Sequence, residues 1–343
     1  MSFFNFFLMD LAIDLGTANT IIMVEGDVVV DEPSLIAIDK NSDKLLAIGH
    51  EALKMYGKTP DNIVVLKPLK DGVIANYRAA EIMITEMIKR VNKIRKKTIF
   101  SSFDNVVVCI PSDITDVEKR AIRDSTIQTG ARNVLMIYEP IAAAIGAGLD
   151  IVNTNANMIV DIGGGTTEIA IITLSNMVCF KSVRIAGNVF NQNIIDYVRK
   201  NYNVIIGEAT AEKAKKSIGS VFDQIDTEQE YIDIYGRNMI IGTPTMVKMT
   251  NKDISIALDK SIALIEETIL QILEQIPPEL SSDLYANGIT LTGGGALLKG
   301  LDKRLSERIG LDIHVAEDPL KAVVKGVDTV LKDRKIYKDV FVK

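Results

Sequence analysis

Two aspartates at equivalent places in a repeated motif are the residues best suited to chemistry. Asp14 lies in LAIDLGTANTIIMV and Asp161 in MIVDIGGGTTEIAII, 161 − 14 = 147 residues later. Each motif runs from an apolar segment through Asp-x-Gly and hydroxyl residues into a second apolar segment. Glycine lets the backbone approach a phosphate closely, and successive N–H groups in such a turn form an anion-binding nest. The repeat therefore predicts two phosphate-binding turns, each with a carboxylate beside it.

A carboxylate beside a polyphosphate suggests a cation between the two. Mg²⁺ prefers oxygen ligands and keeps several of its waters. Asp14 and Asp161, one from each copy, can hold such an ion between them; alternatively, each aspartate only caps its own tight turn. Zinc is poorly supported, because His50 and His314 lie far apart and no Cys/His cluster has metal-ligand spacing.

A third glycine cluster occurs in the segment TGGGALLKGL, residues 292–301. It runs from an expected strand (GITLTG) into an expected helix (ALLKGLDKRLSERI), whose N-terminus favours a phosphate or a sugar edge nearby. Any one of the three clusters alone is an ordinary turn, but all three in this order indicate a nucleotide site. The chain has no Walker string GxxxxGK[ST], and the first two clusters run from strand to strand, whereas a Rossmann fingerprint runs into a helix.

The elements that must position these residues follow from the hydrophobic pattern. The two aspartate motifs are expected to be β-hairpins, because β-branched runs flank each turn. Helices are expected over 79–95, with an apolar stripe, and over 258–276, ended by Pro277-Pro278. The stripe consists of Ile84, Met87, Ile88, Val91 and Ile94. Strands alternate with helices, which is typical of an α/β architecture with two related lobes.

Glu139 stands directly before Pro140 and a helical segment, IAAAIGAG. Proline suits the first turn of a helix, so the glutamate is expected at the helix N-terminus. A carboxylate there is a candidate for the activation of water, and it is equally an ordinary partner of the helix dipole.

Composition narrows the functional classes. The chain has 343 residues, 47% of them hydrophobic, and a net charge of −6, which argues against a nucleic-acid binder. The cysteines, Cys109 and Cys179, lie in apolar strand-like runs and are expected to be free thiols. No apolar run approaches the roughly 20 residues of a spanning helix, and the N-terminus lacks the features of a signal peptide. A cytoplasmic protein is expected.

These motifs resemble the phosphate and adenosine motifs of the actin superfamily, and within it nearly the whole chain resembles the MreB family of bacterial actins. The resemblance rests on the strings IDLGTANT, EPSLIAID, IGHEALKMYGKTP, KPLKDGVIANY, YEPIAAAIGAG, GEATAEKAKKSIGS and AEDPLKAVVKG. It implies a two-lobed, actin-like (ribonuclease H-like) ATPase fold with four subdomains and a nucleotide in the cleft between the lobes. Lobe I is expected over 1–145 plus 320–343, with subdomain IB at about 33–74. Lobe II is expected over 146–319, with IIB at about 183–246.

The resemblance also implies roles for individual residues. Glu139 matches the family glutamate that positions or activates the attacking water, and Thr166 the threonine that assists it. Asp14 and Asp161 match the residues that hold Mg²⁺. Contacts to ATP or ADP are implied for Gly16, Thr17, Ala18, Asn19, Gly163, Gly164, Gly165, Thr166, Glu212, Lys215, Gly294, Gly295 and Ala296. For Glu212 and Lys215, an exposed helix face with solvated charges is the alternative.

One segment departs from the family pattern. After Val-Arg-Ile the family commonly shows Gly-Gly-Asp and then Phe-Asp-Glu, whereas this chain has Ala186 for one glycine and amides at Asn188, Asn191 and Gln192. Because the segment lies near the nucleotide in the family, we expect an altered ATPase rate or coupling, of unspecified sign.

The family resemblance further implies a homopolymer of paired protofilaments on the inner face of the cell membrane, with other cytoskeletal or cell-envelope proteins as further partners. The first membrane candidate is an N-terminal set of apolar residues at helical spacing: Phe3, Phe4, Phe7, Leu8 and Leu11. The alternative is that this segment extends the first strand into the core. Ile99 and Phe100, after a basic run, are the second candidate, and the basic cluster Lys332 to Lys338 a third.

Three other functions fit parts of the pattern. A small-molecule kinase of this fold needs a second substrate pocket, for which no distinct motif is present. An Hsp70-like chaperone needs a C-terminal substrate domain, yet only about 40 residues follow the third glycine cluster. A structural filament with negligible turnover is disfavoured by the presence of Asp14, Glu139, Asp161 and Thr166, whereas the amides in the segment that departs from the family pattern leave it open.

Overall fold

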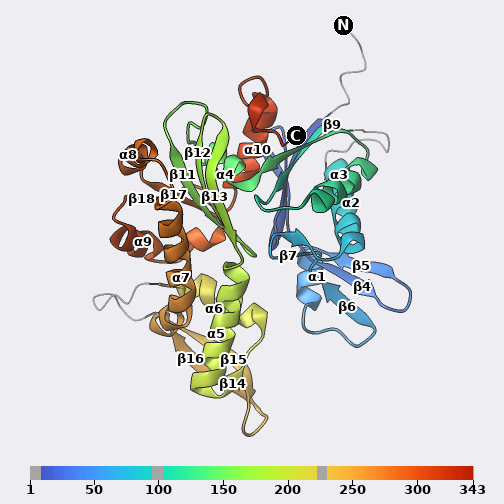
Figure 1. The fold of residues 1–343 in the computed structure, drawn as a ribbon. Coiled ribbons are helices and arrows are strands. Elements are labelled where there is room, and N and C mark those ends of the chain that lie inside the picture. The colour runs from blue at the N-terminus through green and yellow to red at the C-terminus, as the bar shows by residue number, and fades with distance from the viewer. Residues whose placement is uncertain (1–8, 95–102, 222–229, 343) are drawn as a thin grey trace.

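Two five-stranded sheets organise the molecule (Figure 1). The computed structural model describes residues 9–94, 103–221 and 230–342. The first sheet has the order β10-β9-β1-β2-β3 and consists of β1 (Met9–Leu15), β2 (Asn19–Val24), β3 (Asp27–Pro33), β9 (Phe103–Ile110) and β10 (Ala131–Tyr138). The second has the order β13-β12-β11-β17-β18 and consists of β11 (Asn157–Ile162), β12 (Thr167–Thr173), β13 (Asn176–Val183), β17 (Ile289–Thr292) and β18 (Ile313–Val315).

The two sheets share one strand order. In each, an antiparallel meander of three strands is followed by two parallel strands beside the first. Asp14 pairs with Ile21 across the first hairpin, and Asp161 with Glu168 across the second, a separation of seven residues in both (21 − 14 and 168 − 161). The repeat therefore extends from the motif to the whole sheet, and both predicted hairpins are confirmed.

Each large sheet has a smaller sheet beyond one end, as Figure 1 shows. We call each large sheet with its own helices and small sheet a lobe. The first lobe adds β4 (Ile36–Asp39), β5 (Lys44–Ile48), β6 (Ile63–Leu66), β7 (Leu69–Lys70), β8 (Val73–Ile74) and α1 (His50–Met55). The second adds β14 (Val204–Ile205), β15 (Tyr231–Asn238), β16 (Pro244–Thr250), α5 (Gly187–Tyr202) and α6 (Glu208–Ile218). The subdomain limits stay a prediction.

Helices cover the outer faces of the sheets and fill the space between them. The first lobe carries α2 (Tyr77–Ile94) and α3 (Asp116–Gln128); the second carries α7 (Asn251–Leu273), α8 (Pro278–Asn287) and α9 (Leu301–Ile309). Between the two sheets lie α4 (Glu139–Gly146) and α10 (Ala322–Lys332), with a short 3-10 turn (Lys338–Val340) near the C-terminus (Figure 1).

The crossing of α4 and α10 is so close that only glycine fits there. A Cβ on Gly146 would lie 1.7 Å from the carbonyl oxygen of Ala322, and one on Gly326 would lie 1.8 Å from that of Ala142. Helix α4 packs on β11 and β12, whereas α10 packs on β1, β2 and β9. The surrounding buried cluster takes side chains from both large sheets, among them Ala12, Val107, Ile159 and Ile172. One hydrophobic core therefore joins the two lobes.

The helix predictions hold except at their ends. In α2 the stripe is buried apart from Ile94, which is 58% exposed and is the last described residue of the helix. Helix α7 starts earlier than expected, since Thr250 and Asp253 form a capping box at its N-terminus. It ends at Leu273, so Ile276 lies beyond it, and Pro277 then caps α8. Both cysteines are free, Cys109 buried and Cys179 half-buried.

The membrane candidates Phe3, Phe4, Phe7, Leu8, Ile99 and Phe100 lie outside the described residues. Leu11, the last residue of the proposed N-terminal stripe, is fully buried in β1, so a helix that runs to Leu11 is wrong. No helix among the described residues is both long enough and apolar enough to cross a bilayer.

Candidate nucleotide-binding site

The tips of the two long hairpins touch each other. A Cβ on Gly164 would lie 2.5 Å from the Cβ of Ala18, and a Cβ on Gly165 would lie 2.7 Å from the Oγ1 of Thr17. Residues 146 and 148 positions apart (164 − 18 and 165 − 17) are thus brought together, one tip from each lobe. Any side chain larger than that of glycine would push the tips apart, which explains the glycines at Gly164 and Gly165.

Hydrogen bonds from β3 and the residues after it hold the first tip. The Ser34 hydroxyl donates to the carbonyl oxygen of Gly16 over 2.6 Å, and the Ser34 amide donates to that of Ala18 over 2.9 Å. The Ser34 hydroxyl also lies 2.9 Å from the Thr20 hydroxyl, and both side chains are buried. The Thr17 Oγ1 accepts from the Gly72 amide over 3.0 Å. Hydrogen bonds within the chain therefore hold the first tip from both sides.

The start of α5 holds the second tip. The amides of Gly187 and Asn188 donate to the carbonyl oxygens of Gly163 and Gly164 over 3.1 and 2.8 Å. The Gly163 amide donates to the carbonyl oxygen of Thr166 over 2.9 Å and closes the turn. The segment that departs from the family pattern thus contacts the second tip directly through its backbone.

The third glycine cluster is joined to the second aspartate. Thr292 pairs with Asp161 across β17 and β11, and its hydroxyl donates to the Asp161 Oδ1 over 2.9 Å. Gly293 has φ +78°, and a Cβ there would lie 2.4 Å from the carbonyl oxygen of Ile162. The predicted continuous helix is wrong. A 3-10 turn (Gly294–Leu297) comes first, and α9 starts only at Leu301, because Leu298 is extended and Gly300 is left-handed.

The two aspartates are poorly solvated and repel each other. Burial, and then the charge of Asp161, raises the pKa of Asp14 to about 7. The Asp14 side chain is only half-buried by surface exposure, but protein atoms crowd its carboxyl group, so desolvation dominates. Burial also raises the pKa of Asp161 to about 6, although the Thr292 hydrogen bond opposes the rise. Like charges held this way favour a proton or a cation between them.

Glu139 is the first residue of α4, directly after β10, as predicted. Burial raises its pKa well above the ordinary value, and the charges of Glu168, Asp14 and Asp161 add to the rise. Glu168 has 1% exposure and accepts from the Ser112 hydroxyl over 2.6 Å, while its Oε1 has no hydrogen-bond partner among the described residues. Sequence reasoning missed Glu168, although it ends the motif DIGGGTTE.

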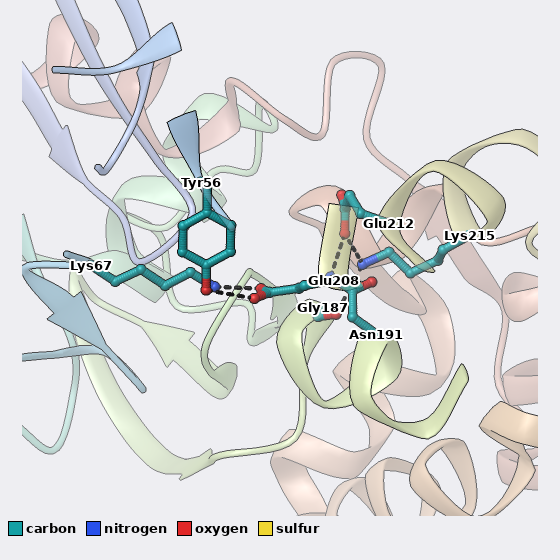
Figure 2. A network of polar contacts seen from close by, with 7 residues as sticks. All are labelled: Tyr56, Lys67, Gly187, Asn191, Glu208, Glu212 and Lys215. Atoms are coloured by element: carbon teal, nitrogen blue, oxygen red, sulfur yellow. Dashed lines mark hydrogen bonds and ion pairs between the residues drawn. The ribbon is translucent and has the colours of Figure 1, made fainter. Parts of the chain in front are cut away.

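Glu212 and Lys215 form a fixed pair on α6, and Figure 2 shows their partners. Lys215 Nζ lies 2.7 Å from the Glu212 Oε2 and donates to the carbonyl oxygen of Gly187 over 2.9 Å. The buried Asn191 amide donates to the same Glu212 oxygen over 2.7 Å. Burial alone would raise the pKa of Glu212, but Lys215 and Asn191 overcome it and lower this pKa to about 2. A face of solvated charges is therefore a poor description of these two residues.

The donor set fits a hydrated Mg²⁺. The described residues contain no group of three or more His, Cys, Asp or Glu side chains arranged as a metal site. Mg²⁺ is commonly bound through one or two carboxylates, with waters and phosphate oxygens completing its shell. Asp14 and Asp161 supply two carboxylates with raised pKa values at the base of the touching tips.

Apart from these contacts, the described chain has a cavity of about 270 Å³ between the small sheet of the first lobe and the start of α2. Ile38, Leu66 and Arg78 are among its lining residues, and none of the predicted site residues lines it. We place the chemistry at the hairpin tips instead, because the glycines and the carboxylates meet there.

Comparisons with known proteins agree with this architecture. The family model described as MreB/Mbl protein matches residues 8–339. The cell shape-determining protein MreB of Escherichia coli (strain K12) is 46% identical over 325 residues, covering 93% of this chain and 92% of that protein. The cell shape-determining protein Mbl of Bacillus subtilis (strain 168) is 44% identical over 326 residues, covering 95% and 96%.

Solved structures of similar fold include the MreB5 protein of Spiroplasma citri bound to AMPPNP. It has a TM-score of 0.89 and 36% identity, covering 96% of this chain and 97% of that one; the ADP-bound form also has a TM-score of 0.89. A MamK double helical filament gives a TM-score of 0.78 at 21% identity, covering 94% and 98%, which speaks for the fold alone. The predicted α/β, actin-like fold is thereby confirmed. Because the family model matches nearly the whole chain and two curated relatives exceed 40% identity, the chain belongs to the MreB/Mbl family.

Proposed function

We propose that this chain binds Mg·ATP between its hairpin tips, hydrolyses it slowly and assembles into membrane-associated filaments that determine cell shape. The observation that carries the proposal is the contact between Gly164–Gly165 and Thr17–Ala18, with an aspartate at the base of each hairpin. The AMPPNP and ADP bound to the Spiroplasma citri protein support the nucleotide.

Each part of the nucleotide has residues suited to it. Backbone N–H groups of both tips, residues 16–19 and 164–166, take the phosphates, while Gly163 closes the second turn through its own N–H. The Glu212–Lys215 pair takes the adenosine from one side, and Gly294, Gly295 and Ala296 take it from the other. Mg²⁺ held by Asp14 and Asp161 would neutralise the charge that develops on the transferred phosphoryl group.

Glu139 and Thr166 are the proposed hydrolytic residues. A general base works best with a pKa near the operating pH, and burial together with four neighbouring carboxylates moves the pKa of Glu139 in that direction. Thr166 is buried at the second tip, where its side chain lies close to Gly72 of the first lobe. The two side chains position water rather than form a covalent intermediate, since phosphoryl transfer to water is mostly positioning and electrostatics.

The turn between β15 and β16 supports filament formation. Ile240 and Ile241 are 78% and 68% exposed there, and the Asn238 side chain accepts from both of their amides, which fixes the turn. Exposed apolar side chains on a fixed turn mark an interaction site, and a contact with a different patch of the next copy builds an open filament.

Sedimentation with and without ATP, combined with phosphate release, tests this function. Ile240→Asp with Ile241→Asp is expected to raise the critical concentration about tenfold or more, since burying one such side chain contributes about 1.5–3 kcal/mol. Ile256→Asp, at another exposed isoleucine on α7, is the matched control. A chain that hydrolyses ATP yet stays soluble at all concentrations would contradict the filament and favour a kinase or chaperone-like ATPase.

Membrane binding is proposed through Phe3, Phe4, Phe7 and Leu8, with Ile99 and Phe100 as a second element. Deleting residues 2–8 is expected to remove most co-sedimentation with phosphatidylglycerol vesicles, because a short apolar segment binds weakly and relies on the many copies in a filament. Replacing Ile99 and Phe100 by serine is the comparison variant. Unchanged co-sedimentation after the deletion would show that the N-terminal segment is not the anchor.

A further inference from the structure

A glutamate of the second lobe is held by two side chains of the first lobe (Figure 2). The Tyr56 hydroxyl donates to the Glu208 Oε2 over 3.0 Å, and Lys67 Nζ forms an ion pair with the Glu208 Oε1. Lys67 Nζ also lies 5.4 Å from the centre of the Tyr56 ring. We call Tyr56, Lys67 and Glu208 the clasp. It joins residues 152 and 141 positions apart in the sequence.

The clasp is more than a solvated surface pair. The side chains of Lys67 and Glu208 keep only 29% and 31% of their exposure. Burial, and then the charge of Glu208, raises the pKa of Tyr56 to about 12, so its hydroxyl remains a donor at neutral pH. Both carboxylate oxygens are thus occupied, one by a cation and one by a hydroxyl. Charge-assisted hydrogen bonds are stronger than neutral ones, whereas exposed ion pairs contribute little.

The clasp and the proposed adenosine residues lie on one helix. Glu208 is the first residue of α6, and Glu212 and Lys215 follow at i+4 and i+7 (212 − 208 and 215 − 208). That spacing places the three side chains along one face of the helix. The same face is fixed to α5 through Asn191 and the Gly187 carbonyl oxygen. Helix α6 therefore connects the first lobe to the adenosine residues through a rigid element.

We propose that Glu208 is a positioning residue that couples closure of the two lobes to retention of the nucleotide. With the clasp formed, α6 is held against the first lobe, and the adenosine cannot leave until the clasp breaks. The clasp thereby sets the rate of nucleotide release rather than the rate of the chemical step. This inference rests on the proposed nucleotide function.

Dissociation of a fluorescent ADP analogue, mant-ADP, from the full chain below its critical concentration tests the clasp. Two single variants are each expected to raise the dissociation rate about fivefold or more. Glu208→Gln removes the ion pair, and Lys67→Glu places a second carboxylate opposite Glu208. The double variant Lys67→Glu with Glu208→Lys restores the pair with its charges exchanged and is expected to return the rate to near the original. Asp43→Asn is the matched control, because Asp43 pairs with Arg78 within the first lobe and asparagine tolerates its positive φ.

The outcomes separate the clasp from the proposed function. Rates in Glu208→Gln and Lys67→Glu equal to that of Asp43→Asn would overturn the clasp while leaving nucleotide binding intact. Faster release that the exchanged pair does not restore would also overturn it, since Glu208 would then act within its own lobe. If the unmodified chain failed to bind mant-ADP at all, the proposed function and the clasp would fail together.

Discussion

Replacing Glu139 by alanine is expected to slow phosphate release about 10²-fold or more while ATP-dependent sedimentation survives. Glu139 begins α4 from a position fixed by β10 and by the proline that follows it. Burial and the charges of Glu168, Asp14 and Asp161 raise the pKa of its carboxyl group, so this group lies near the two aspartates of the proposed phosphate site. Removal of the side chain deletes a group that orients water but none of the glycine amides that take the phosphates. Binding and assembly should therefore persist.

The measurement is phosphate release together with sedimentation at several protein concentrations. Glu139→Gln keeps the shape of the side chain and should lose turnover to a similar degree, because the amide cannot take a proton from water. Glu86→Ala, on the exposed side of α2, controls for the loss of a carboxylate elsewhere. If ATP binding and turnover were lost to the same extent, Glu139 would have a structural role. If turnover were unchanged, Glu139 would not be the hydrolytic residue, and Glu168 would be the next candidate.

Replacing Asp161 by asparagine should have two opposite effects. Mg-dependent ATP binding is expected to fall about 100-fold or more, since one of the two proposed carboxylate ligands is lost. The nucleotide-free chain, in contrast, should become more stable at pH 8. The folded-state pKa of about 6 exceeds the ordinary 3.8, so the ionised form is penalised in the fold. The difference corresponds to about 3 kcal/mol at pH 8.

The sign of the pH dependence follows from this shift. The folded Asp161 binds its proton more tightly than the unfolded one, so its contribution lowers the stability of the original chain as pH rises from about 4 to about 6. The advantage of asparagine should therefore shrink as pH falls through that window. Thermal unfolding without nucleotide or Mg²⁺ at pH 8, 6 and 4 measures it. Asp14→Asn should also stabilise the nucleotide-free chain, and its advantage should shrink as pH falls from about 7 to about 4, because the folded-state pKa of Asp14 is about 7. A variant less stable than the original at pH 8 would show that the buried charge is not costly.

The sequence predicted the elements with local signals and missed the contacts between distant segments. The two hairpins followed from the Asp-x-Gly repeat, because flanking β-branched runs leave few alternatives to a hairpin, whereas the strand order that the two five-stranded sheets share was not predicted. The bond between Thr292 and Asp161 depends on strand pairing over 131 residues, which periodicity does not reveal. The 3-10 turn at Gly294 and the late start of α9 depend on the backbone angles of Gly293, Leu298 and Gly300, so element ends were predicted less accurately than the elements themselves.

The candidate site shows the same division. Asp14, Asp161 and Glu139 carried motif signals and lie where the hairpins and α4 place them. No motif signal marked the clasp residues Glu208, Lys67 and Tyr56. A glutamate at the start of a helix and two residues directly after short elements are too common in sequences to indicate a contact. Asn191 had been singled out only as a departure from the family pattern. In the structure its amide supplies a hydrogen bond to Glu212 that an ionised carboxylate could not donate.

The glycine crossing of α4 and α10 determines how the lobes can move. Backbones in direct contact at Gly146 and Gly326 cannot approach further, and the shared core around them resists separation. The motion left to the lobes is then a rotation about this crossing, which lies near one end of both lobes. A rotation of a few degrees about the crossing displaces the distant parts of the two lobes, where Tyr56 and Glu208 meet, by several ångströms. Formation or loss of the hydrogen bond between Tyr56 and Glu208 therefore reports a rotation of the lobes that is too small to change the packing of the core.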